Sequence, residues 1–162
     1  AMISAVDLLK GIAVGAGMQV IEVPGADGTL HTNYRGKAEA AVRTLLEDGN
    51  DFVYIHVEAP DEMGHQGSAE RKIQAIEAID REIVRVVTEQ MNESGEPYRI
   101  LLLPDHPTPI RCRTHTSNPV PFILYDRTQE RWMRSAYSER EAAERGEYVP
   151  DGYRLIERLF ER

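Results

Sequence analysis

The sequence contains little that would indicate a secreted, membrane-spanning or nucleic-acid-binding protein. Its single cysteine, Cys112, excludes an internal disulfide and favours a reducing cytoplasm. Basic residues are outnumbered, with 19 Lys and Arg against 27 Asp and Glu, whereas nucleic-acid surfaces need clustered cations. No apolar run approaches the roughly eighteen residues that span a bilayer, and no export signal is visible. We therefore expect a soluble, cytoplasmic protein without a membrane or nucleic-acid partner.

Length and apolar content indicate one folded domain. With 162 residues, 41% of them hydrophobic, the chain can bury one core and is too short for two domains. No internal repeat, low-complexity tract or linker divides it. Ala1 and Met2 resemble residues added at the start of a natural sequence, so we expect no structural role for them.

Hydrophobic periodicity predicts strands that alternate with helices. Short apolar runs between turn residues indicate strands at 18–23, 52–57, 99–103 and 119–125. Helical spacing indicates a helix capped by Ser4 and further helices at 38–46, 68–92, 138–145 and 151–162, with a charged connection at 126–137. The 68–92 helix carries one apolar stripe that comprises Ile73, Ile76, Ile79, Ile83, Val86 and Val87. The βαβαβ order predicts an α/β fold, with a mostly parallel sheet covered by helices on both faces.

Carboxylates and imidazoles gather in two loops, at 59–67 and 103–116, and each loop follows a predicted strand. The carboxyl ends of parallel strands meet at one edge of a sheet, so the two loops should share a cleft. Their potential metal ligands are Asp61, His65, Asp105, His106 and His115. Five oxygen and nitrogen donors exceed what one cation normally takes from side chains. The pattern therefore predicts a pair of divalent ions.

Glycine and proline support this interpretation of the two loops. Gly64 and Gly67 would let the backbone of the first loop fold closely around an ion. Pro104 and Pro107 enforce a turn in the second loop, so that the two side chains between them can face one cleft.

Two arginines of the second loop are candidate phosphate ligands. Arg111 and Arg113 are close enough in sequence to hold a phosphate bidentately, and solvent-facing arginines are the alternative. Cys112 between them is interpreted as incidental rather than nucleophilic. The polar segment 31–37 lies at a helix start, where it is either a plain polar loop or an anion-binding one.

Other polar residues near the loops have simpler interpretations. His56 lies inside a strand and is expected to be a buried, hydrogen-bonded imidazole. Glu58 and Glu62 either orient ligating histidines or lie in solvent. Asp80 is expected on a helix surface.

Four ordered segments carry a family resemblance. They are Val57-Glu58-Ala59-Pro60-Asp61-Glu62 with Gly64-His65 and Gly67, then 75–80, then Leu103-Pro104-Asp105-His106-Pro107, then Arg113-Thr114-His115-Thr116 with 119–122. Together with 3–11 and 32–34, they resemble the archaeal-type cofactor-independent phosphoglycerate mutases, which belong to the alkaline-phosphatase-like metalloenzymes. The resemblance is strongest over residues 3–125.

The resemblance implies a two-metal phosphotransferase, in which a metal-activated serine takes a phosphoryl group and returns it to another hydroxyl. By motif position, Asp61, His65 and His115 would hold one ion, and Asp105 with His106 would hold the other. Manganese is the expected metal, with zinc or magnesium as alternatives. The substrate would be a small phosphorylated metabolite, with 3-phosphoglycerate and 2-phosphoglycerate interconverted through a phosphoserine intermediate.

The sequence departs from the family at the nucleophile. Family members carry the reactive serine and a further aspartate ligand on an upstream segment, and nothing before Ile3 supplies them. The hydroxyls near the motifs do not match that serine; they belong to Ser68, Thr108, Thr114, Thr116 and Ser117. We expect the carboxyl-terminal part of an alkaline-phosphatase-like catalytic domain, inactive alone and self-associating through its truncated sheet edge or an apolar helix face. A related phosphatase, a homoserine-kinase-like phosphotransferase and a non-catalytic metal-binding domain are the alternatives.

Overall fold

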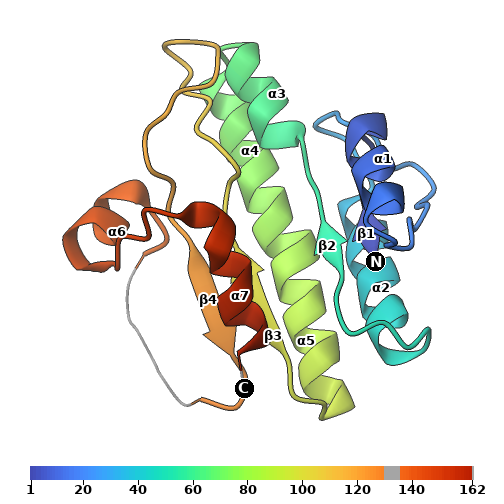
Figure 1. Ribbon diagram of the computed structural model, residues 1–162. Coiled ribbons are helices and arrows are strands. Elements are labelled where there is room, and N and C mark those ends of the chain that lie inside the picture. Colours follow the sequence, from blue (N-terminus) through green and yellow to red (C-terminus); the bar gives the residue numbers. More distant parts are fainter. Residues whose placement is uncertain (130–135, 162) are drawn as a thin grey trace. The chain divides into compact units, whose positions relative to one another are not determined.

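The computed structural model describes residues 1–129 and 136–161, which fall into two compact units. The first unit (residues 1–95 and 108–114) contains β1 (Met2–Ile3), α1 (Asp7–Gly15), α2 (Tyr34–Leu46), β2 (Tyr54–Ile55), α3 (Ala59–His65), α4 (Ala69–Ile79), the π-helix η1 (Asp80–Val84) and α5 (Arg85–Ser94). The second unit (residues 96–107 and the described part of 115–162) contains β3 (Arg99–Leu102), β4 (Ile123–Asp126), α6 (Glu139–Arg145), the 3-10 helix η2 (Gly152–Arg154) and α7 (Leu155–Phe160) (Figure 1). The predicted α/β class is confirmed. Part of the predicted charged connection, 130–135, lies outside the described residues.

Strand β1 lies between two parallel neighbours. Met2 pairs with Tyr54 and Ile3 with Ile55 of β2, and Met2 also forms a parallel bridge with Val20. In place of the strand predicted at 18–23, the structure has this single bridge at Val20. The expectation that the first two residues have no structural role is wrong, because both are buried and their backbone groups complete the ladder.

The first helix starts later than its predicted cap. Its N-cap position is Val6, without a side-chain cap, and α1 begins at Asp7. The Ser4 hydroxyl instead accepts a hydrogen bond from the Val6 N–H at 3.0 Å. This short local turn competes with capping, so the helix begins at a later residue.

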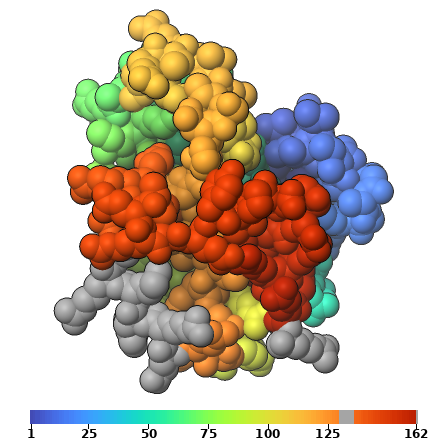
Figure 2. Space-filling model, turned by 60° about the vertical axis from the view of Figure 1, so that its left-hand side comes forward, coloured from blue at the N-terminus to red at the C-terminus, as the bar shows by residue number. Residues whose placement is uncertain are grey.

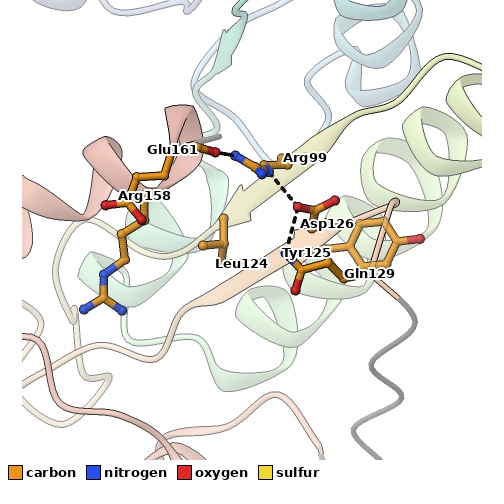
Figure 3. A pocket seen from close by; sticks show the side chains of 7 residues that line it. All are labelled: Arg99, Leu124, Tyr125, Asp126, Gln129, Arg158 and Glu161. Atoms are coloured by element: carbon orange, nitrogen blue, oxygen red, sulfur yellow. Dashed lines mark hydrogen bonds and ion pairs between the residues drawn. The ribbon is translucent and has the colours of Figure 1, made fainter.

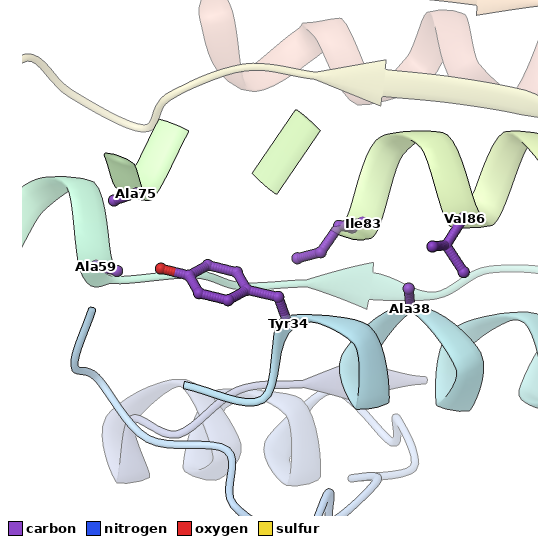
Figure 4. Close-up of a cluster of buried hydrophobic side chains, with 6 residues drawn as sticks. All are labelled: Tyr34, Ala38, Ala59, Ala75, Ile83 and Val86. Atoms are coloured by element: carbon purple, nitrogen blue, oxygen red, sulfur yellow. The ribbon is translucent and has the colours of Figure 1, made fainter. Parts of the chain in front are cut away.

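Two clusters of buried side chains hold α2 against its neighbours in the first unit. One cluster joins α2 to α3, α4, η1 and α5 and consists of Tyr34, Ala38, Ala59, Ala75, Ile83 and Val86 (Figure 4). The other joins α2 to β1 and consists of Ala1, Ile3, Ile21, Ala40 and Ala41. Because many of these residues are alanines, the backbones can approach closely at native packing density.

The long predicted helix contains a π-helical turn. η1 joins α4 to α5 and adds one residue to the helical repeat. Ile83 and Val86 are buried as predicted, whereas Ile73 and Ile76 are 55% and 49% exposed. The prediction of one continuous apolar stripe is therefore wrong for its first half. There, Ala75 is the buried residue.

Strands β3 and β4 form the sheet of the second unit. They pair antiparallel, with Arg99 opposite Asp126 and Leu102 opposite Ile123, so the expected parallel order does not extend to them. The strand predicted at 119–125 begins later, because its two prolines cannot donate to a ladder. α7 packs against β3, and the segments of α6 and α7 lie next to each other (Figure 2).

Candidate metal centre

The first ligand segment is a helix rather than a loop. α3 follows β2 closely, with Pro60 in its first turn together with Asp61 and Glu62. Proline is preorganised for a first helical turn, and carboxylates there interact favourably with the helix dipole. The prediction of an irregular loop is wrong for this reason. As a result, Asp61 and His65 lie one turn apart on the same face of α3.

Asp61 and His65 present one ligand atom each to a common point. Asp61 Oδ2 lies 3.3 Å from His65 Nε2. Two ligands about 2.1 Å from one tetrahedral ion are separated by about 3.4 Å, so this spacing fits a shared cation. The other polar atoms of both side chains contact residues 108–114. Asp61 Oδ1 accepts a hydrogen bond from the Thr108 hydroxyl, and His65 Nδ1 lies 2.9 Å from the Arg113 carbonyl oxygen.

Two glycines allow residues 108–114 to pack closely on this part of the chain. A Cβ atom at Gly64 would lie 2.6 Å from the Thr108 carbonyl oxygen, and one at Gly67 would lie 2.5 Å from Arg113 Nε. Lys72 Nζ donates to the same Thr108 oxygen at 2.8 Å. These glycines therefore admit a second segment of protein. Their role in folding the backbone around an ion stays a prediction.

The second unit brings the remaining candidate ligands together. Asp105 Oδ2 lies 3.2 Å from His106 Nε2, and Asp105 Oδ1 accepts a hydrogen bond from the His106 N–H at 3.0 Å. The ring centroids of His106 and His115 are 3.6 Å apart, and a nitrogen of one ring lies within 4.8 Å of a nitrogen of the other. The Thr116 N–H donates to the Pro107 carbonyl at 3.1 Å and joins the two arms of the loop. These carboxylate and imidazole donors are of the types that bind divalent metals.

The two candidate phosphate ligands are exposed residues of the first unit. Arg113 has a φ of 52°, which is uncommon for a residue with a side chain. Cys112 between the arginines is an exposed thiol outside any disulfide. Binding of phosphate by Arg111 and Arg113 stays a prediction.

Comparison with known proteins agrees with this donor chemistry. Residues 1–148 match the family model described as the metalloenzyme superfamily. The chain belongs to this superfamily. Membership and the two donor groups support divalent-metal binding by this metalloenzyme chain. No helix in the described part of the chain is long and apolar enough to cross a bilayer.

Several relatives of this metalloenzyme chain have a more specific name. The "Probable 2,3-bisphosphoglycerate-independent phosphoglycerate mutase" of Geobacter sulfurreducens is 49% identical over 100% of this chain and 40% of its own length. The 2,3-bisphosphoglycerate-independent phosphoglycerate mutase of Methanosarcina acetivorans is 57% identical over 77% of this chain and 31% of its own length. The structure of the PH0037 protein from Pyrococcus horikoshii has a TM-score of 0.77 at 31% identity, covering 88% of this chain and 42% of that chain. The chain thus spans less than half the length of these relatives.

The metalloenzyme chain also contains a buried ion pair at the start of α3 that was not predicted. The Lys37 side chain is fully buried, with its ammonium group 3.0 Å from the His56 carbonyl oxygen and 3.8 Å from the Glu58 carboxylate. His56 Nδ1 lies 3.6 Å from that carboxylate and 3.3 Å from the Ser4 hydroxyl. Among the described residues, neither carboxylate oxygen of Glu58 accepts a hydrogen bond. His56 is hydrogen-bonded as predicted, but it is only half-buried. Lys37 belongs to α2 and not to a polar loop.

Burial and the neighbouring charges shift the pKa values of Lys37 and Glu58 in opposite directions. Burial lowers the pKa of the Lys37 ammonium group, and the Glu58 carboxylate offsets part of that effect. Burial raises the pKa of the Glu58 carboxyl, but His56, the backbone N–H of Glu58 and Lys37 together bring its pKa below the usual range. Lys37 lies three residues after Tyr34 and four before Ala41, both buried in α2. This helical spacing was the sequence signal that could have indicated its burial.

The second unit has a cavity of about 370 Å³, lined by none of the proposed ligands. Its lining residues are Arg99, Leu124, Tyr125, Asp126, Gln129, Arg158 and Glu161 (Figure 3). Arg99 Nε lies 2.8 Å from Asp126 Oδ2, and Arg158 pairs with Glu147 at 2.7 Å. Because these charges are already paired, the cavity is a weaker candidate for ligand binding than the clustered donors.

Proposed function

We propose that this chain carries the metal-binding part of the catalytic domain of a 2,3-bisphosphoglycerate-independent phosphoglycerate mutase. Such an enzyme interconverts 3-phosphoglycerate and 2-phosphoglycerate, in this proposal through a phosphoserine. The observation that carries the proposal is 49% identity over the whole chain to the Geobacter sulfurreducens relative of that name. The carboxylate and imidazole donors of both units provide ligands of the kind that metal-assisted phosphoryl transfer requires.

The proposed ligands are divided between two divalent ions. Asp61, His65 and His115 hold one divalent ion in this proposal, and Asp105 with His106 holds a second. Manganese is the proposed metal because it accepts both carboxylate and imidazole ligands, with zinc or magnesium as alternatives. When bound, such ions neutralise phosphate charge and lower the pKa of an attacking hydroxyl.

The proposed substrate is a small phosphorylated metabolite, whose phosphate Arg111 and Arg113 bind. A guanidinium group can hold phosphate oxygens through two parallel hydrogen bonds. We assign the nucleophilic serine to no residue of this chain, so the chain alone should lack mutase activity. A cytoplasmic location stays a prediction.

Self-association is a further part of the proposal. Helix α1 exposes Leu8 and Ile12, which lie one turn apart on one face. Apolar side chains that cluster at a surface favour contact with another protein surface. Light scattering over a range of concentrations should detect species larger than the monomer, and a monomer at every concentration would contradict this part.

Metal binding is tested by titrating the chain with Mn²⁺. We expect about one ion per chain, because two protein ligands hold a second ion more weakly than three. Replacing His65 or His115 with alanine should remove this binding. The matched control is His31→Ala, since His31 is an exposed histidine outside both donor groups. Unchanged affinity in His65→Ala/His115→Ala would show that the ligand assignment is wrong.

Mutase activity is tested in a chimera. This chain replaces the matching segment of the Geobacter sulfurreducens relative, to which it aligns over its full length. We expect manganese-dependent conversion of 3-phosphoglycerate to 2-phosphoglycerate, and its loss in Asp61→Ala. A folded, metal-binding chimera without mutase activity would contradict the proposed function.

A further inference from the structure

The Thr108 side chain contacts the proposed ligand Asp61 from the side opposite to His65. Thr108 is only 3% exposed, and its hydroxyl donates a hydrogen bond to Asp61 Oδ1. An ionised carboxylate can only accept, so the hydroxyl must be the donor. A buried hydroxyl has little access to water, and this bond therefore determines its orientation.

The backbone of Thr108 is held in place by two helices. Lys72 of α4 donates to its carbonyl oxygen at 2.8 Å. On α3, Gly64 leaves space for the same oxygen, because an added Cβ would lie only 2.6 Å from it. The position of Thr108 is therefore fixed, and its hydroxyl can align the Asp61 carboxylate.

We propose that Thr108 is a positioning residue that orients Asp61 for metal binding. Its bond to Oδ1 fixes the rotation of the carboxylate and directs Oδ2 toward His65 Nε2, 3.3 Å away. A partner that fixes a ligand in this way improves metal affinity. The inference rests on the proposed function, because it takes Asp61 and His65 as ligands.

The Arg113 carbonyl complements Thr108 by orienting His65. A carbonyl oxygen can only accept, so the 2.9 Å contact places the ring proton on His65 Nδ1. In the neutral ring the lone pair is then on Nε2, the nitrogen that faces Asp61 Oδ2. The segment 108–114 thus fixes both proposed ligands of α3 through one side chain and one backbone group.

The test separates the hydroxyl of Thr108 from its packing. Thr108→Val keeps the shape of the side chain and removes the hydroxyl. We expect its Mn²⁺ affinity, measured by calorimetric titration, to fall by about 10- to 100-fold, whereas Thr108→Ser should bind nearly as tightly as the unmodified chain. The matched control is Thr44→Val, since the Thr44 hydroxyl is buried and has no hydrogen-bond partner among the described residues. It should leave Mn²⁺ affinity unchanged.

Each outcome decides the role of Thr108. Equal Mn²⁺ affinity of Thr108→Val and the unmodified chain would overturn it. If Thr108→Val does not fold, Thr108→Ser and Thr108→Ala decide instead, because both lose the methyl group and only one keeps the hydroxyl. Equal affinity of those two variants would overturn the proposal.

A further variant separates this inference from the proposed function. Asp61→Ala should abolish Mn²⁺ binding. If binding persists in Asp61→Ala, the ligand assignment itself is wrong and this inference fails with it. If Asp61→Ala loses binding but Thr108→Val does not, only the positioning role is overturned.

Discussion

Replacing Lys37 with methionine should strongly destabilise the first unit. The Lys37 ammonium group is fully buried, 3.8 Å from the Glu58 carboxylate and 3.0 Å from the His56 carbonyl oxygen. Methionine keeps most of the apolar stem, so the main change is a buried carboxylate left without its cation. Removing one partner of a buried ion pair costs about 3–5 kcal/mol.

We expect the lower end of that range, because Glu58 keeps its second neighbour, His56 Nδ1, at 3.6 Å. For a domain of this size, each kcal/mol lowers Tm by about 2–4 °C, so a loss of about 3 kcal/mol lowers Tm by about 6–12 °C. Thermal and urea unfolding followed by circular dichroism measure both quantities.

A double-mutant cycle tests whether charge is the cause. Glu58→Gln alone should also destabilise, since it leaves Lys37 as a buried cation. In Lys37→Met/Glu58→Gln neither charge is left unpaired, so the double variant should recover a large part of the loss. A single-variant effect within about 0.5 kcal/mol, as for a surface substitution, would refute the reasoning. So would strict additivity of the two substitutions.

The pH dependence gives an independent check. The pKa of Glu58 is lowered in the folded chain from its ordinary value of 4.5. Its contribution to stability is therefore complete above that value and is lost as the pH falls through the lower folded-state pKa. Without Lys37 the carboxyl is protonated more easily on acidification. The destabilisation by Lys37→Met should consequently be smaller near about pH 4 than at pH 7.

Two further predictions concern other parts of the chain. Hydrogen bonds from the Thr128 hydroxyl and N–H lower the pKa of Asp126 to about 2, so its contribution is present above the ordinary carboxyl pKa and is lost as the pH falls through about 2. Asp126→Asn should therefore reduce stability at neutral pH and flatten its decline between about pH 4 and 2 in an acid-unfolding titration; an unchanged decline would contradict this. Gly64→Ala should cost about 1–3 kcal/mol in urea unfolding, because its methyl group would press on the Thr108 carbonyl oxygen. Its control, Gly11→Ala in α1, meets nothing within 4 Å and should be neutral or stabilising; equal effects of both substitutions would rule out this steric explanation.

The alternation of helices and strands was predictable because it follows from local apolar spacing. The spacing of residues such as Ala38 and Ala41 correctly indicated α2. Strand β1 was missed because its position depends on pairing with Val20 and β2, which no local pattern reveals. The helical start at Pro60 was read as a loop, although proline in a first turn is compatible with a helix.

The donor chemistry of the candidate site was predictable for a similar reason. Polar residues such as Asp61 and Asp105 interrupt the sequence directly after apolar runs, and both occur beside histidines in the structure. The residues that orient these donors carried no such signal. Nothing local distinguishes Thr108 from Thr114, and only the folded first unit brings the Thr108 hydroxyl to Asp61.

The π-helical turn at Asp80–Val84 sets the rotational phase between two halves of one long helix. An extra residue in a repeat of 3.6 rotates everything after it by about 100°. α4 can therefore pack on α3 through Ala75 while α5 packs on α2 through Val86. Deleting one residue from η1 would restore a regular helix. Only one of the two helix contacts could then form. The π-helical turn thus lets one continuous helix pack both on α3, which carries Asp61, and on α2, which carries Lys37.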